Sequence, residues 1–141
     1  MEAIAEYGHA IAALAGTAVF QLLLGPLSAM RKTRAGLAPG AEPPADYGNP
    51  AYRWHRAHAN LAESMGPFAA ATVAAILAGA PAFWVNLFAS LFLVLRFVLA
   101  AVHVAGIGKP DMSVRSVIFV GGWLMCLCLA YLAIRTVVFG G

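Results

Sequence analysis

Charged side chains are scarce in this 141-residue chain, where they make up 11% of the residues against 62% for apolar ones. Soluble domains carry about 25% charged and about 45–50% apolar residues. A single core of this size is too small to bury so much apolar surface. The composition therefore excludes an ordinary soluble domain and indicates one small helical membrane domain over residues 1–141.

Cysteine is also nearly absent, and the two present are Cys126 and Cys128, inside an apolar segment. Side chains two residues apart on a helix point about 200° away from each other. This geometry disfavours a disulfide or a shared metal ion, and it indicates two small packing residues. The sequence predicts no metal site.

Basic residues are few and unevenly spread, with a net charge of +3. No basic patch with interleaved aromatic residues lies on a soluble face, so we expect no nucleic-acid partner. Most of the Lys and Arg residues fall in or beside two polar stretches, a bias that sets the orientation of membrane proteins. These six are Arg31, Lys32, Arg34, Arg53, Arg56 and Lys109.

Apolar segments of about 20 residues are what the chain has in abundance, and this is the length that crosses a bilayer as a helix. We predict membrane-spanning helices at about residues 7–30, 57–80, 83–105 and 114–139. The fold class is then an all-α integral membrane protein with a bundle of four transmembrane helices per subunit.

Residues 31–56 form the one long polar connection, and their prolines and glycines indicate an irregular loop. With four spans, this loop and residues 106–113 lie on the same side of the membrane. The positive-inside rule makes that side cytoplasmic and places both termini on the opposite side.

Polar side chains at membrane depth are costly, and each is therefore a candidate functional residue. Arg56, Asn60 and Glu63 are spaced i, i+4, i+7, which puts all three on one helical face. His58 lies about 200° from Arg56 on the same helix.

Two further segments contribute polar groups to the same half of the bundle. Arg96 and His103 lie seven residues apart on the third predicted span, and Arg115 and Ser116 open the fourth. One glutamate does not neutralise three arginines, so this cluster favours an anionic ligand or an ionised thiol. The alternative is structural: Arg56 and Arg115 reach lipid phosphates, while Asn60 and Glu63 bond neighbouring helices.

The stretch RAHANLAESMGPF at residues 56–68 resembles the second-helix signature of the MAPEG family, the membrane-associated proteins of eicosanoid and glutathione metabolism. VRSVIF at 114–119 is similar to the start of the family's fourth helix, and the chain length and long first loop agree. The matching motif residues are Arg56, His58, Asn60, Glu63, Pro67 and Phe68.

The resemblance implies a homotrimer that binds glutathione, as co-substrate, between adjacent subunits near the cytoplasmic face. Arg115 would hold the glutathione thiolate, with Ser116 beside it, and a hydrophobic, lipid-like substrate would arrive from the bilayer. The glutathione-binding residues it implies are Arg56, Asn60, Glu63, Arg96, His103 and His58.

The implied activity is a membrane glutathione-dependent transferase or peroxidase acting on hydrophobic electrophiles or lipid hydroperoxides. The chain departs from the family at Phe119 and His103, where tyrosine is often found, and at Ala59, where some relatives have arginine. The alternative is therefore a non-catalytic trimeric scaffold or lipid-binding protein with the same fold. A third class, an anion transporter or channel, is disfavoured because no second polar face lines a pore.

Overall fold

The computed structural model describes residues 2–108 and 113–140. The described residues form helices and contain no strand, which confirms the all-α prediction. Lys109, counted above among the basic residues, lies outside the described part. The elements are α1 (Glu2–Ala5), α2 (Gly8–Arg34), α3 (Pro50–Leu77), α4 (Ala82–Ala105) and α5 (Val114–Phe139).

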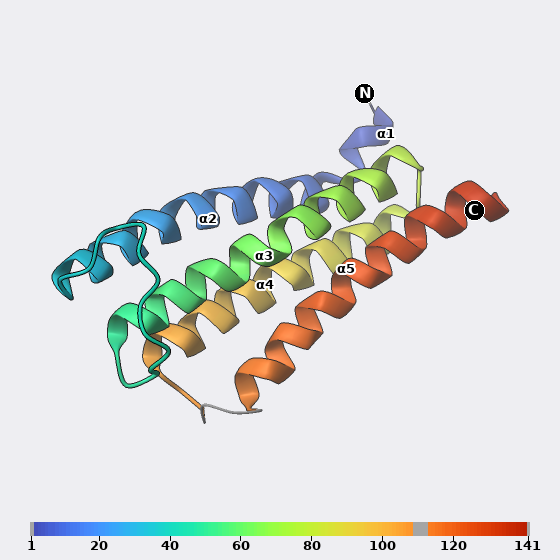
Figure 1. Ribbon diagram of the computed structural model, residues 1–141. Helices are drawn as coiled ribbons and strands as arrows, with labels where there is room; N and C mark the ends of the chain where they lie inside the picture. The colour runs from blue at the N-terminus through green and yellow to red at the C-terminus, as the bar shows by residue number, and fades with distance from the viewer. Residues whose placement is uncertain (1, 109–112, 141) are drawn as a thin grey trace.

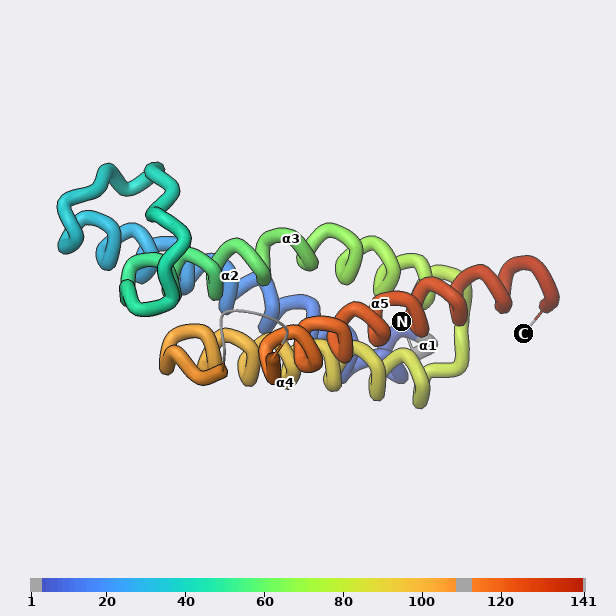
Figure 2. Tube along the Cα trace, turned by 60° about the horizontal axis from the view of Figure 1, so that its bottom comes forward, coloured from blue at the N-terminus to red at the C-terminus, as the bar shows by residue number. Residues whose placement is uncertain are grey.

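The four long helices run along one bundle axis, and the chain direction reverses from each helix to the next (Figure 1). α2 and α5 each pack against both α3 and α4, which form the centre of the bundle. Both chain termini lie at one end, while loop 35–49, the end of α4 and the start of α5 lie at the other (Figure 1). Figure 2 shows this loop folded over the end of the bundle where α2 stops and α3 begins.

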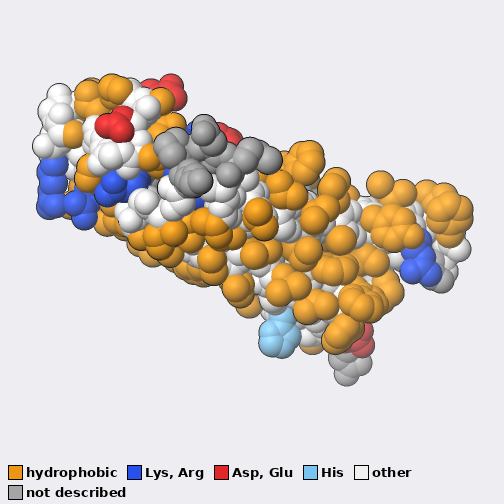
Figure 3. Space-filling view, turned by 90° about the horizontal axis from the view of Figure 1, so that it is seen from below, with side chains coloured by type: hydrophobic (Ala, Val, Ile, Leu, Met, Phe, Trp, Pro, Cys, Tyr) orange, Lys and Arg blue, Asp and Glu red, His pale blue; other side chains and the backbone are white. Residues whose placement is uncertain are grey.

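The outer surface identifies the chain as a multi-pass integral membrane protein. α2, α4 and α5 are each long and apolar enough to cross a membrane, while α3 is interrupted by polar residues such as Asn60 and Glu63. Large apolar side chains face outward, among them Leu22 at 73% and Leu77 at 81% exposure. Hydrophobic side chains cover most of the face in Figure 3, and Lys and Arg gather mainly at the loop end.

Aromatic stacking and short polar contacts hold the interior together. Phe68 of α3 and Phe92 of α4 stack with ring centroids 3.9 Å apart, and both are fully buried. At the terminal end, the Tyr7 hydroxyl donates to the Ala80 carbonyl at 2.6 Å, so the start of α2 is tied to the α3–α4 turn. These contacts fix the register in which α3 and α4 present their polar faces.

The connection between α2 and α3 is shorter than the irregular loop predicted for residues 31–56. α2 continues to Arg34 and α3 already begins at Pro50, seven residues before the predicted start at 57. Asn49 caps α3, its Oδ1 accepting from Ala51 N at 2.9 Å, and a proline at the first helical position needs no donor. Pro50 is thus a helix start rather than a loop residue.

The other boundaries differ less. α3 ends at Leu77 rather than 80, and Gly79 follows with a φ of 69°, a left-handed conformation that suits glycine. α4 and α5 fall within one residue of their predicted bounds. The short α1 had no counterpart in the prediction.

Candidate functional site

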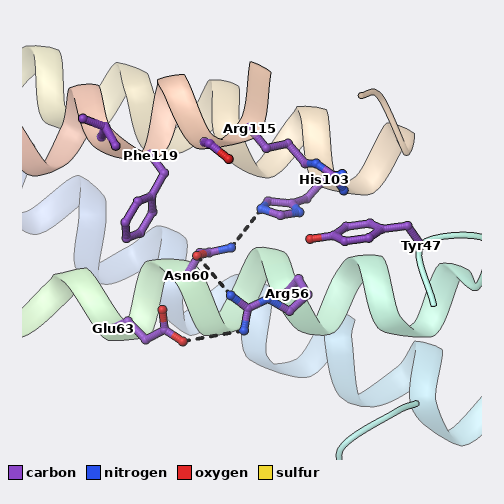
Figure 4. A pocket seen from close by; sticks show the side chains of 9 residues that line it. Tyr47, Arg56, Asn60, Glu63, His103, Arg115 and Phe119 are labelled. Atoms are coloured by element: carbon purple, nitrogen blue, oxygen red, sulfur yellow. Dashed lines mark hydrogen bonds and ion pairs between the residues drawn. The ribbon is translucent and has the colours of Figure 1, made fainter. Parts of the chain in front are cut away.

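A cavity of about 280 Å³ opens at the loop end, where α3, α4, α5 and loop 35–49 meet (Figure 4). It contains six of the eight side chains predicted for the site, together with a tyrosine from the loop and two apolar residues. The lining residues are Tyr47, Arg56, Asn60, Glu63, His103, Arg115, Ser116, Phe119 and Val120.

The α3 wall is the predicted polar stripe. Arg56 Nη2 donates to Asn60 Oδ1 at 3.4 Å, and Arg56 Nη1 lies 3.7 Å from Glu63 Oε1. The side chain of Glu63 is 55% exposed, so this ion pair adds little stability. Its effect is on position: a cation and an anion are presented side by side at the cavity wall.

Asn60 connects this stripe to α4. Its Nδ2 lies 2.8 Å from His103 Nε2, and both side chains are buried. With Oδ1 turned toward Arg56, the amide N–H donates to His103, whose Nε2 therefore accepts and carries no proton. This donation requires the His103 tautomer that carries its proton on Nδ1.

Arg115 lies in the first turn of α5 and is 5% exposed. Its Cζ is 3.6 Å from the ring centroid of Tyr47, and its Nε donates to Ser113 Oγ at 3.4 Å. Ser116, the next residue, also faces the cavity. A guanidinium cation in such a low-dielectric wall stabilises a negative charge, such as a thiolate, that binds next to it in the cavity.

Tyr47 is the polar lining residue that sequence reasoning missed, and Val120 is an apolar one. It lies in DYGNP, a stretch of turn-forming residues without helical periodicity, so no motif connected it with the distant α4 and α5. Its ring stacks on His103, with centroids 5.9 Å apart and 15° between the planes. The one hint in the sequence was that Tyr47 is an aromatic residue shortly before Pro50, where α3 begins.

His58, which the resemblance implied as a glutathione-binding residue, lies on a different face of α3 from Arg56, Asn60 and Glu63. It is not among the cavity residues, and its Nε2 accepts from Gln21 Nε2 of α2 at 3.0 Å. This places His58 in the α2–α3 contact rather than in the wall of the cavity.

His58→Leu should therefore weaken the α2–α3 contact while leaving ligand binding within about twofold of wild type. One buried or half-buried hydrogen bond contributes about 1 kcal/mol. Thermal unfolding in detergent and calorimetric titration with glutathione measure the two effects. Asn60→Leu, on the cavity face of the same helix, is the matched control. A large loss of affinity in His58→Leu would contradict this placement.

Arg96 lies behind the cavity wall rather than in it. It is 2% exposed and packs between the rings of Phe92 and Phe119, 4.9 and 5.2 Å from its Cζ. Its Nη2 donates to the Phe119 carbonyl at 3.1 Å, whereas Nε and Nη1 have no hydrogen-bond partner in the described part of the chain. Arg96 therefore holds Phe119, which in turn lines the cavity.

The part of the chain that the structure describes contains no cluster of potential metal ligands. No group of three or more His, Cys, Asp or Glu side chains comes together there. Cys126 and Cys128 are free thiols, and neither lines the cavity. The site is instead a cationic pocket with one carboxylate at its rim.

Comparison with known proteins agrees with the resemblance drawn from the second-helix motif. The model of the MAPEG family matches residues 9–135, which is most of the chain. No curated protein and no solved structure matches it.

Proposed function

Because the chain belongs to the MAPEG family, whose members are in general membrane proteins of glutathione-dependent transferase or peroxidase type, we propose that it activates glutathione for attack on hydrophobic electrophiles or lipid hydroperoxides. The observation that carries this proposal is the cavity that brings Arg56, Glu63 and Arg115 together. These are the charges that a zwitterionic tripeptide thiol requires.

The assignments follow from charge. Glu63 accepts from the α-amino group of glutathione, Arg56 binds a carboxylate, and Asn60 supplies a further polar contact. Arg115 faces the sulfur and stabilises its ionised form, since a free thiol has a pKa of about 8.5 and is mostly protonated at neutral pH. Ser116 lies beside the same sulfur position.

The second substrate reaches this sulfur from the bilayer. Phe119 and Val120 form an apolar wall on the α5 side. In conjugation, the thiolate gives its electron pair to the electrophilic carbon, and the leaving group departs with the bonding pair. With a hydroperoxide, the thiolate attacks the terminal oxygen, the alkoxide takes a proton from water, and a second glutathione reduces the sulfenic acid, giving the disulfide and water.

Assembly and orientation belong to the same proposal. The cavity of about 280 Å³ is slightly smaller than the range for ligand sites, about 300–1,000 Å³, and this fits a pocket completed by a neighbouring subunit of a homotrimer. Arg31, Lys32 and Arg34 end α2 at the loop end of the bundle, while Arg135 lies near the other end. This bias supports a cytoplasmic loop end.

The test is calorimetric titration of the purified protein in detergent with glutathione, followed by conjugation of an aryl halide and reduction of a lipid hydroperoxide. We expect binding at or below millimolar concentration and thiol-dependent turnover of at least one substrate. Titration with S-methyl glutathione separates binding of the peptide from ionisation of the thiol. Binding without turnover of any hydrophobic electrophile or hydroperoxide would contradict the proposal.

The second candidate is the scaffold or lipid-binding protein, favoured by one observation: the α5 wall carries Phe119, whose side chain has no hydroxyl. This candidate predicts no heat with millimolar glutathione while the oligomer remains intact. The same titration therefore decides between the two functions.

A further inference from the structure

Tyr47 enters the cavity from outside the helical bundle. It is half-buried, and its ring centroid lies 3.6 Å from the guanidinium carbon of Arg115 and 5.9 Å from the ring centroid of His103. Figure 4 shows its hydroxyl directed into the cavity, toward the side where Asn60 and Arg56 lie. It thus brings a phenolic O–H next to the guanidinium that faces the sulfur.

The loop around Tyr47 is held by a network of specific contacts. Arg53 Nη1 donates to the carbonyls of Tyr47 at 2.8 Å and Gly48 at 3.1 Å, while its Nε donates to Val104 O at 3.3 Å. One side chain therefore ties the loop to the end of α4. Asp46 Oδ1 accepts from Gly48 N at 2.8 Å and closes the turn on the other side of Tyr47.

Gly106 leaves room for the Arg53 side chain that holds the loop. A Cβ at this position would lie 3.2 Å from Arg53 Cδ and Nε, closer than ordinary contact, and its φ is 71°. The left-handed glycine thus ends α4 and allows Arg53 to pass over it. The position of Tyr47 is therefore determined by α3 and α4 together, not by the loop alone.

We propose that Tyr47 is a further catalytic residue, whose hydroxyl donates a hydrogen bond to the glutathione thiolate alongside Arg115. This inference rests on the proposed function, because it requires a bound thiol. The thiol releases its proton to water, and the sulfur that remains accepts from both the phenol and the guanidinium. The donor comes from the loop, whereas the α5 position Phe119 supplies only apolar surface.

The hydroxyl and the ring have separable effects. Hydrogen bonds to charged groups contribute about 1.5–3 kcal/mol, so loss of the O–H disfavours the thiolate by about tenfold or more. The ring provides the face on which Arg115 lies, a cation–π contact that Tyr47→Phe retains and Tyr47→Leu removes.

The experiment measures the pH at which half of the bound thiol is ionised, from the ultraviolet absorbance of the thiolate at saturating glutathione. Tyr47→Phe should raise this midpoint by about one pH unit and lower kcat/KM for conjugation about tenfold at neutral pH. Glutathione affinity measured below the midpoint, where the bound thiol is neutral, should stay nearly unchanged. Tyr47→Leu should in addition weaken binding. An unmoved midpoint in Tyr47→Phe, or a loss of affinity without a shift, would overturn the inference.

Two further variants separate a direct effect from a disturbed loop. Tyr52 packs edge-on against Tyr47, with centroids 5.1 Å apart, but does not line the cavity, so Tyr52→Phe should leave the midpoint in place. Arg53→Gln introduced into the wild-type protein should raise the midpoint, because Arg53 holds the backbone of Tyr47. Introduced into the Tyr47→Phe variant, it should have no further effect on the midpoint. An equal shift in Tyr52→Phe, or additive effects of Arg53→Gln and Tyr47→Phe, would count against Tyr47. Failure of the wild-type protein to bind glutathione at all would instead refute the proposed function.

Discussion

Arg115→Ala should lower the rate of glutathione conjugation about 100-fold at neutral pH. The wild-type guanidinium lies at the cavity wall, 5% exposed, where a cation acts on a thiolate with little screening by water. Removal of one such preorganised donor from a reacting anion costs about 100- to 1,000-fold in kcat. Steady-state conjugation of an aryl halide at saturating glutathione measures the loss.

Arg115→Lys is the matched variant. It keeps a positive charge but loses the planar fork and the broad contact with the Tyr47 ring, so we expect a loss of about tenfold, between wild type and Arg115→Ala. The rate of Arg115→Ala should recover partly at high pH, where free glutathione ionises by itself. Equal rates for Arg115→Ala and wild type would contradict the role assigned to this residue.

Gly122→Ala should destabilise the bundle by about 2–3 kcal/mol, which lowers Tm in detergent by roughly 5–10 °C. A Cβ at Gly122 would lie 2.7 Å from Arg96 Cζ and 2.8 Å from its Nε. The end of an arginine side chain usually moves aside at little cost. Here the guanidinium is 2% exposed and packed between Phe92 and Phe119, so moving it aside would disturb both ring contacts.

The neighbouring glycine provides the control. A Cβ at Gly121 would meet Leu95 at 3.5 Å, an ordinary contact, so Gly121→Ala should be close to neutral or slightly stabilising. In an Arg96→Leu background, the cost of Gly122→Ala should fall below about 1 kcal/mol, because the shorter leucine does not reach the glycine. An undiminished cost in that background would show that the clash is not with Arg96.

Periodicity predicted the α3 face of the site well. Arg56, Asn60 and Glu63 line one cavity because 3.6 residues per turn leaves them on one side of the helix, and the same rule directs His58 toward α2. The same polar residues make α3 less apolar than α2, α4 and α5, the three helices that are apolar enough to cross a membrane by composition.

The loop was the weakest part of the prediction, for a physical reason. Proline and glycine interrupt helices in some contexts and begin or end them in others, so Pro50 was counted within a loop although Asn49 and Pro50 together start α3. The position of Tyr47 depends on Arg53 reaching Val104, a contact between residues 51 apart in the chain. No local pattern encodes such a pairing.

The sequence by itself determined that this is a helical membrane protein of the MAPEG family, because apolar segment length and a dense second-helix motif are local properties of the chain. The tertiary structure alone decided which polar residues meet. It joined Asn60 to His103, set Arg96 behind Phe119 against Gly122, and laid Tyr47 over Arg115. These contacts depend on the rotation and register of packed helices, which are fixed by side-chain fit across the bundle and not by the periodicity of any one segment.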